Sequence, residues 1–217
     1  MIKIGITGHR PNRLKVPKKK LAARVRSVLT SLMKAASGSK TKDRPVLDII
    51  SPLAEGCDRI VARETLALGQ RISAVIPFKR RDYETTFGDA ATTKEFRALW
   101  KAADERTVLK GTLARPEAGY VAVGMVTLAR SDVIVTIWDG KLAAGRGGTP
   151  EILQNAIEWG IPIIWLHATE DRKPVLVMSG KRGKTVPQLE RLAKKGKPLT
   201  VALYRKLVAV ARGNHSG

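Results

Sequence analysis

The chain has 217 residues, of which 43% are hydrophobic and 5% aromatic, and its formal net charge is +21. This composition excludes a chain that is disordered throughout and favours one α/β domain with an extension. No apolar run approaches the roughly 20 residues of a membrane helix, and the strand-like start leaves no space for a signal peptide, so we expect a cytoplasmic protein without membrane contact. The single Cys57 excludes an internal disulfide, and because no Cys/His cluster has zinc spacing we expect neither a metal nor another cofactor.

Apolar patterning predicts the elements in chain order. Strands are expected at residues 2–6, 46–50, 72–76, 132–138 and 161–166, and helices at 18–36, 58–68, 96–103, 117–129 and 148–159, with an irregular segment at 79–93. Because strands and helices alternate and several strands are apolar on both faces, the sequence predicts an α/β fold with helices on both faces of a mostly parallel sheet.

The pattern weakens after residue 168. An edge strand at 174–178 and a helix at 199–210 are the elements expected there. We therefore divide the chain into a domain at 1–168 and a basic C-terminal extension of uncertain structure at 169–217.

The positive charge is concentrated in two flanks. Residues 10–44 hold 12 Lys/Arg and one acid, residues 170–217 hold 12 Lys/Arg and three acids, and residues 45–169 hold 15 of each sign. Such flanks are typical of proteins that bind nucleic acid or another polyanion, and also of solvated faces that keep a protein in solution. Since Tyr204 is the one aromatic residue in either flank, base stacking has little support there, and we favour the solvated faces.

Polar and glycine-rich segments follow the predicted strands. In an open parallel sheet, ligands bind beyond the carboxyl ends of the strands, near the point where the strand order reverses. The candidate ligand-binding residues in these segments are Thr7, Gly8, His9, Arg10, Glu55, Gly56, Asp58, Asp139, Gly140, Gly147, Gly148 and Thr149.

The glycine-rich segment 145–149 (GRGGT) is the clearest of these signals, because it follows the strongest strand and leads into a helix. Glycines let the backbone approach a phosphate closely, and the first N–H groups of a helix favour an anion. The alternative is a flexible surface loop with an ordinary N-cap. We favour the anion site.

The other candidates have structural alternatives of similar weight. His9 is as readily structural as ligand-binding, and Asp58 is expected to be a favourable charge in a first helical turn more than a ribose ligand. Glu55 and Asp139 are candidates for ribose hydroxyls or for catalysis, and Tyr120 is either a ligand contact or a half-buried helix residue. The first loop does not have the G-x-G-x-x-G pattern of NAD-binding proteins.

Four segments and Tyr120 resemble, in the same order, the SLOG superfamily. The segments are 5–10 (GITGHR), 52–59 (PLAEGCDR), 131–140 with SDVIV and WDG, and 147–149 (GGT). This family is related to the lonely-guy (LOG) cytokinin-activating enzymes and to the Rossmann-like domain of the DNA-processing protein DprA. The resemblance covers about residues 1–168. It implies a bacterial protein with a Rossmann-like three-layer sandwich that binds a nucleotide or nucleotide-derived ligand, often as a sensor or regulatory protein and often as a homo-oligomer.

One departure from the lonely-guy enzymes bears on catalysis. Those enzymes carry P-G-G-x-G-T-x-x-E, whose Glu is catalytic, but with Thr149 aligned this chain has Ile152 at that position. Glu151 lies one residue earlier, about 100° around the helix. Arg146 also replaces the second glycine of the pattern. The resemblance therefore implies the phosphate site without the hydrolytic carboxylate.

We therefore expect a nucleotide-binding module, a sensor with little catalysis. Two alternatives stay open. One is an N-glycosidic hydrolase of nucleoside 5'-monophosphates in which Glu55 or Asp139 replaces the missing carboxylate. The other is a DprA-like protein that binds nucleic acid through the basic flanks.

Overall fold

The computed structural model of the chain describes residues 1–37, 44–141, 148–177 and 199–213. Its strands are β1 (Ile2–Gly8), β2 (Leu47–Ser51), β3 (Arg71–Phe78), β4 (Glu105–Gly111), β5 (Val133–Trp138), β6 (Ile163–His167) and β7 (Val175–Val177). Its helices are η1 (Pro11–Arg13), α1 (Lys18–Ala36), α2 (Cys57–Ala67), α3 (Arg80–Glu84), α4 (Ala90–Ala102), α5 (Pro116–Ala129), α6 (Thr149–Glu158) and α8 (Val201–Gly213).

The strands described here form one sheet in the order β4-β3-β2-β1-β5-β6-β7. All neighbours are parallel except β6 and β7, so the predicted mostly parallel sheet is confirmed. Ile4 of β1 pairs with Ile49 of β2 on one side and with Val133 of β5 on the other. The chain order of the strands reverses between β1 and β5, and such a switch point leaves a crevice beyond the carboxyl ends.

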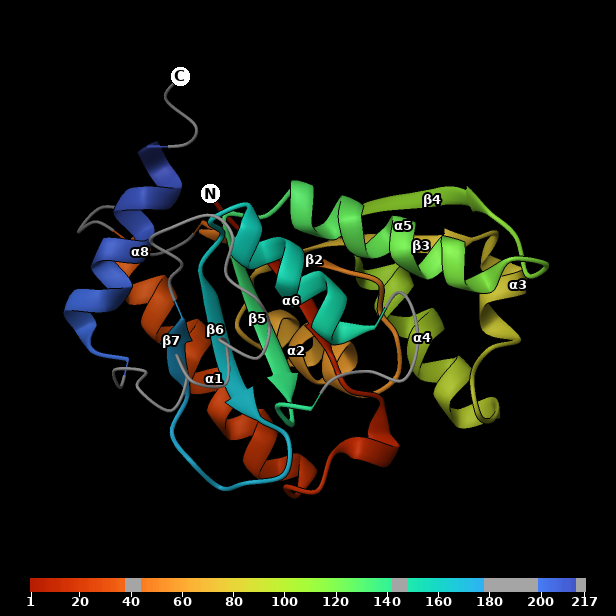
Figure 1. Cartoon of the computed structure of the whole chain (residues 1–217), viewed down its shortest axis with the longest axis horizontal. Helices are drawn as coiled ribbons and strands as arrows, with labels where there is room; N and C mark the ends of the chain where they lie inside the picture. Colours follow the sequence, from red (N-terminus) through yellow and green to blue (C-terminus); the bar gives the residue numbers. More distant parts are fainter. Residues whose placement is uncertain (38–43, 142–147, 178–198, 214–217) are drawn as a thin grey trace.

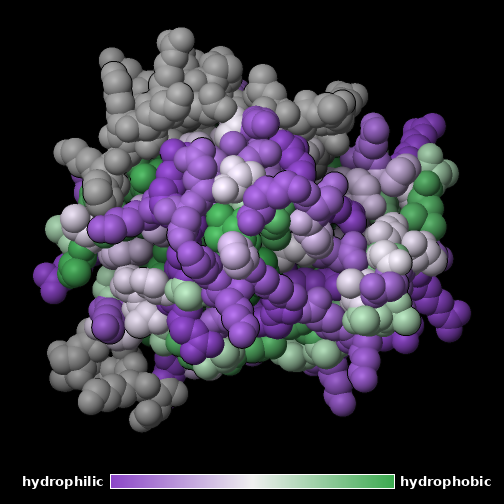
Figure 2. Space-filling model, turned by 90° about the horizontal axis from the view of Figure 1, so that it is seen from below, coloured by the Kyte–Doolittle hydropathy of each residue, from purple (hydrophilic) through white to green (hydrophobic). Residues whose placement is uncertain are grey.

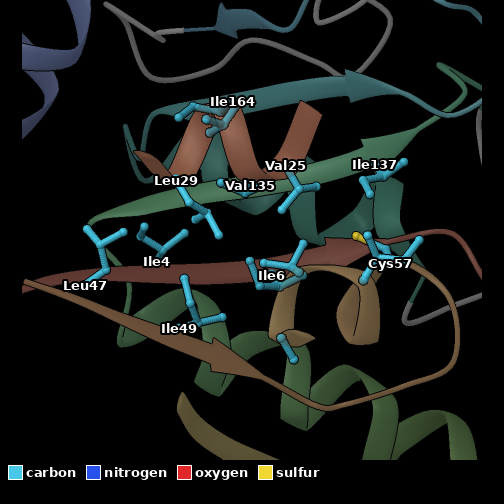
Figure 3. Packing of buried hydrophobic residues seen from close by; sticks show 14 of the residues in the cluster. Ile4, Ile6, Val25, Leu29, Leu47, Ile49, Cys57, Val135, Ile137 and Ile164 are labelled. Atoms are coloured by element: carbon cyan, nitrogen blue, oxygen red, sulfur yellow. The ribbon is translucent and has the colours of Figure 1, made fainter. Parts of the chain in front are cut away.

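Helices cover both faces of the sheet, which gives the three layers of an α/β sandwich (Figure 1). Helices α5 and α6 lie on one face, and α1, α2 and α8 lie on the other. Helix α1 has the bounds expected from its apolar spacing, and its Val25 and Leu29 pack on Ile4 and Val135 of the sheet (Figure 3). Removing such apolar side chains from water is the main favourable contribution to folding.

The sequence expectations were wrong in two places. The segment 79–93 is not irregular, because it contains α3 and the start of α4, where Asp89 accepts a hydrogen bond from the Thr92 N–H at 2.7 Å and caps the helix. Strand β4 was not expected at all. It is the edge strand beside β3, and its residues are exposed or half-buried, so it lacks the apolar run of a central strand.

The described parts of residues 169–217 pack on the same core as the rest of the chain. Strand β7 pairs with β6, and Tyr204, Leu207 and Val208 of α8 are buried in the cluster that includes α1. The expected edge strand and helix are therefore present, and the domain boundary at residue 168 stays a prediction. None of the helices described is long and apolar enough to cross a membrane.

Candidate functional site

A cleft of about 360 Å³ opens at the switch point between β1 and β5. We call it the carboxyl-edge cleft, because β5 and β6 point toward this side of the molecule, the lower side in Figure 1. Viewed from that side, the surface is largely hydrophilic and hydrophobic residues show near its centre (Figure 2). The sequence candidates that line the cleft are Thr7, Gly8, His9, Arg10, Asp58, Tyr120, Gly148 and Thr149.

The remaining candidates lie beside the cleft or away from it. Asp139 contacts the cleft residues His9 and Arg13 from the end of β5, and Gly140 follows it with a φ of 84°. Glu55 and Gly56 line a different pocket, on the α1 and α2 side. Gly147 lies outside the described residues, as does the rest of the glycine-rich segment before Gly148.

Asp139 holds two side chains of the cleft in place. Its Oδ1 lies 2.8 Å from His9 Nε2, and its Oδ2 accepts hydrogen bonds from Arg13 Nη2 at 2.7 Å and Nε at 3.2 Å. The Lys141 backbone N–H also donates to Oδ1, at 3.0 Å. With both oxygens engaged and the side chain 7% exposed, Asp139 positions His9 and Arg13 in this structure.

This arrangement sets the charges of the cluster. Burial on its own would raise the pKa of Asp139, but its contacts with His9, the Lys141 N–H and Arg13 outweigh that effect and lower the pKa to about 2. Burial lowers the pKa of His9 below its ordinary value of 6.5, although Asp139 acts in the opposite direction. At neutral pH the cluster therefore combines a carboxylate, a guanidinium and a mostly neutral imidazole.

Asp58 is a buried acid at the start of α2. Its Oδ2 accepts a hydrogen bond from the Ala54 N–H at 3.1 Å, so it fastens the loop after β2 to the helix. Burial raises the pKa of Asp58 to about 7, against the opposing effects of the Ala54 N–H and of Arg10 and Arg59. Asp58 lies in the first turn of α2 and also lines the cleft, but its raised pKa means that burial disfavours the charge expected there, and its role as a ribose ligand stays a prediction.

Gly8 and Gly56 allow the N-terminus of α2 to approach the end of β1. A Cβ atom on Gly8 would lie 2.5 Å from Cys57 Sγ, and one on Gly56 would lie 2.4 Å from the His9 carbonyl oxygen. Gly56 also has a φ of 93°, which disfavours residues with a side chain. The Cys57 N–H then donates to that His9 carbonyl at 3.1 Å. In this structure the two glycines serve close packing beside the cleft.

The N-terminus of α6 faces the cleft through Gly148, Thr149, Pro150 and Ile152. Gly148 is the N-cap, and Pro150 has no N–H to donate, so few backbone donors are present in this first turn. The Glu151 N–H donates to the Gly148 carbonyl at 3.1 Å. Ile152 lines the cleft and Glu151 does not, as the sequence comparison with the lonely-guy enzymes predicts.

Three polar cleft residues were missed by the sequence reasoning, namely Asn12, Arg13 and Tyr83. Asn12 and Arg13 belong to η1, in the same loop after β1 as the residues that were singled out. Tyr83 lies in α3, five residues after the end of β3. Sequence reasoning could have found them by the same rule, applied to the first helical turn after each strand as well as to the residues directly after it.

The described residues contain no group of three or more His, Cys, Asp or Glu side chains that could hold a metal ion.

No protein-family model matches the chain, and no curated protein matches it in sequence. Among solved structures, DNA processing protein A (DprA) from Streptococcus pneumoniae is similar, with a TM-score of 0.57 and 17% identity over 95% of this chain and 61% of that one. DprA from Helicobacter pylori has a TM-score of 0.53 and 14% identity over 98% of this chain and 81% of that one. At these identities the likeness establishes the fold, which is Rossmann-like. The chain spans less than two thirds of the S. pneumoniae protein.

Proposed function

We propose that the carboxyl-edge cleft binds a nucleotide or a nucleotide-derived molecule. The observation that carries this proposal is the meeting of Thr7, Arg10 and the N-terminus of α6 in one cleft at the switch point of the sheet. The phosphate would lie against Gly148 and Thr149, where the helix dipole favours an anion; Thr7 and Arg10 would supply the donors that Pro150 removes from this turn.

The rest of the cleft suits a base and a sugar. Tyr120, Val123 and Ile152 offer aromatic and apolar contact, and small-molecule sites typically combine such walls with a few polar groups. Near neutral pH the raised pKa of Asp58 leaves this acid partly protonated, which reduces its repulsion of a phosphate. When charged, the same carboxylate can accept a ribose hydroxyl.

The geometry favours a sensor over a hydrolase. Ile152 occupies the position of the catalytic Glu in the lonely-guy pattern, Asp139 has both oxygens bonded, and Glu55 does not line the cleft. We therefore expect no release of free base when the protein is incubated with nucleoside monophosphates or NAD and the products are separated by chromatography. Rapid base release that disappears in Asp139→Asn or Glu55→Gln would favour the hydrolase instead.

Gly148→Val tests the phosphate site. Gly148 has a φ of −82°, which a β-branched residue adopts without strain, so the variant is expected to fold. Its side chain would stand where the phosphate approaches the backbone, and calorimetric titration with AMP, GMP and their triphosphates should show at least about tenfold weaker binding. Gly148→Ala is the matched smaller change and should lose less. A folded Gly148→Val protein that binds as the parent does would show that the phosphate lies elsewhere.

A second candidate is binding of single-stranded nucleic acid. The H. pylori DprA of similar fold binds single-stranded DNA, and this chain carries exposed cations near the carboxyl edge, among them Arg10, Lys79, Arg80 and Arg81. Anisotropy titration of oligothymidine of about twelve nucleotides would test it. Binding should weaken steeply between about 50 and 200 mM salt if several phosphates are contacted. A salt-independent affinity would leave the mononucleotide proposal as the better one.

A further inference from the structure

A second pocket, of about 220 Å³, lies between the start of α1, helix α2 and the first turn of α4. We call it the α1–α2 pocket. Its apolar wall consists of Leu14, Val16, Leu21 and Ile60, three of which are less than 7% exposed. Three of its lining residues, Glu55, Gly56 and Arg59, belong to the segment 52–59 that carries the resemblance, but the proposed function does not use this pocket. An apolar hollow of this kind, with charged groups at its edge, is the usual form of a small-molecule site.

The two acids of the α1–α2 pocket are already bonded within the protein. Glu55 accepts a hydrogen bond from the Gly88 N–H at 3.1 Å and forms an ion pair with Arg10 at 3.4 Å. Glu95 forms ion pairs with Arg63 and with Arg59. Neither carboxylate is therefore left to attract a cation.

Of the basic groups of the pocket, Arg59 and Arg63 are both paired with Glu95. Lys18 is exposed at the first turn of α1, and no ion pair to it occurs among the described residues. Arg59 is 2% exposed, and it donates to the Leu53 and Thr92 carbonyls at 3.0 and 2.6 Å. Its Nη2 has no hydrogen-bond acceptor in the part of the chain described. The pocket thus offers the Lys18 ammonium and Arg59 Nη2 as donors above an apolar wall, while the rest of the Arg59 guanidinium is held by the two carbonyls, by Glu95 and by the Phe87 ring 4.5 Å away.

We infer that the α1–α2 pocket binds a small aliphatic carboxylate. The carboxylate would lie toward Lys18 and Arg59, and the branched hydrocarbon end would pack on Leu14, Leu21 and Ile60. The volume is below the range of about 300–1,000 Å³ found for drug-sized ligands, so the ligand is small. A free carboxylic acid and an apolar amino acid share this chemistry.

This site is separate from the carboxyl-edge cleft. Ala54 and Asp58 line the cleft, whereas Glu55, Gly56 and Arg59 line the pocket, so the start of α2 stands between them. Binding in the pocket does not require a nucleotide, and failure of the nucleotide proposal would leave this inference untouched.

Methyl NMR of the whole chain tests the inference with a readout at each site. Titration with 4-methylpentanoate should shift the methyl signals of Leu14, Val16, Leu21 and Ile60 in a saturable way. Val123 and Ile152 line the cleft, and the signals of their methyl groups should not shift. No saturable shift at millimolar concentration, or shifts at the cleft methyls alone, would overturn the inference.

Lys18→Ala and Lys19→Ala form a matched pair, because both side chains are exposed in the first turn of α1 and Lys18 alone lines the pocket. Lys18→Ala should weaken binding by up to about fivefold, as expected for one exposed charge pair, and Lys19→Ala should not. Leu14→Trp, which fills the pocket from a half-buried position, should abolish binding. Equal affinity in all three variants would contradict the assigned site.

Two further ligands distinguish the sources of the carboxylate. The neutral 4-methylpentanamide should bind more weakly than 4-methylpentanoate, by at least the factor lost in Lys18→Ala, because it has no charge to pair with Lys18 or Arg59. Leucine adds an ammonium group beside the paired acids Glu55 and Glu95. Weaker binding of leucine would identify a free acid as the ligand, and tighter binding would identify an amino acid. An amide that binds as well as the carboxylate would overturn the inference that the pocket binds a negatively charged group.

Discussion

The charge of Asp58 couples the stability of the protein to pH. This acid is buried and its pKa is raised to about 7, so between about pH 4 and 7 the folded state holds a proton that the unfolded state releases. The stability that Asp58 contributes is therefore fully present at low pH and is lost as the pH rises through 7. Asp58→Asn removes this titration and keeps an oxygen that can accept from the Ala54 N–H. Between pH 5 and 8 the variant should gain roughly 2–3 kcal/mol in unfolding free energy relative to the parent.

Urea denaturation of both proteins at pH 5, 6.5 and 8 measures this difference. Burial also lowers the pKa of His9 and of His167 below the ordinary value of 6.5, so both histidines make the protein less stable as the pH falls below 6.5. They are present in both proteins and cancel in the comparison. A difference between parent and variant that is constant with pH would mean that Asp58 does not change its charge in this range.

Gly56 should not tolerate a side chain. Its φ of 93° and the His9 carbonyl 2.4 Å from an added Cβ both oppose alanine. Gly56→Ala should lower the unfolding free energy by roughly 2 kcal/mol or more and should disturb the loop that carries His9. Gly69→Ala is a useful comparison, because that glycine also has a positive φ but has open space around it. Thermal unfolding should show a larger loss for Gly56→Ala. Equal losses would mean that backbone strain alone accounts for the effect.

At the scale of residues, sequence reasoning located the cleft better than it assigned roles. The rule that ligands lie beyond parallel strands selected Thr7, His9 and Thr149, which the structure brings into one cleft. It did not show that Asp139 is engaged by His9 and Arg13, because such contacts depend on how loops from different strands cross. For the same reason it did not show that Glu55 lies outside the cleft, where its carboxylate accepts a hydrogen bond from the Gly88 N–H.

At the scale of elements, helices and strands with a regular apolar pattern were predicted, and an element without such a pattern was not. Helix α1 was predicted at its observed bounds because its buried residues recur with helical spacing over 19 residues. Strand β4 was missed because an edge strand is partly solvated and carries charged residues such as Arg106 and Lys110. Charges at such an edge oppose pairing with another chain, and they also remove the sequence signal.

Helix α8 should contribute substantially to stability, although the sequence reading treated it as part of an extension. Leu207 is 3% exposed in the core shared with α1, whereas Val210 on the same helix is 39% exposed. Leu207→Ala should therefore lower the unfolding free energy by about 2–5 kcal/mol, and Val210→Ala by less than about 0.5 kcal/mol. Urea denaturation measures both changes, when all variants are fitted with the same slope of unfolding free energy against urea concentration. Little effect of Leu207→Ala would indicate that α8 is not docked and that residues 169–217 act as a separate extension.

At the scale of the whole molecule, the positive charge of the N-terminal flank lowers the stability of helix α1, where that charge meets the helix N-terminus. Helix α1 has no acid in its first turn, where Lys18, Lys19 and Lys20 stand in sequence. Cations at a helix N-terminus face the positive end of the dipole and are unfavourable. Lys20 is paired with Asp171 at 2.8 Å, which leaves Lys18 and Lys19 without an ion pair among the described residues; such a local conflict is expected where charge is kept for contact with a polyanion. This observation adds to the support for the nucleic-acid candidate.

Lys19→Glu separates the two effects of this charge. It replaces a repelled group with an attracted one, so at low salt it should raise the unfolding free energy by about 0.5–1 kcal/mol, with a smaller gain as salt screens the interaction. Lys101→Glu makes the same change in net charge in the last turn of α4, where a cation is favourable, and should lower stability instead.

If the flank binds single-stranded nucleic acid, Lys19→Glu should also weaken oligonucleotide binding and reduce its salt slope by about 0.7 for each phosphate that is no longer neutralised. Equal stability changes in the two variants would show that net charge, not the helix dipole, governs the effect. Undiminished oligonucleotide binding by Lys19→Glu would remove this turn of α1 from the proposed interface.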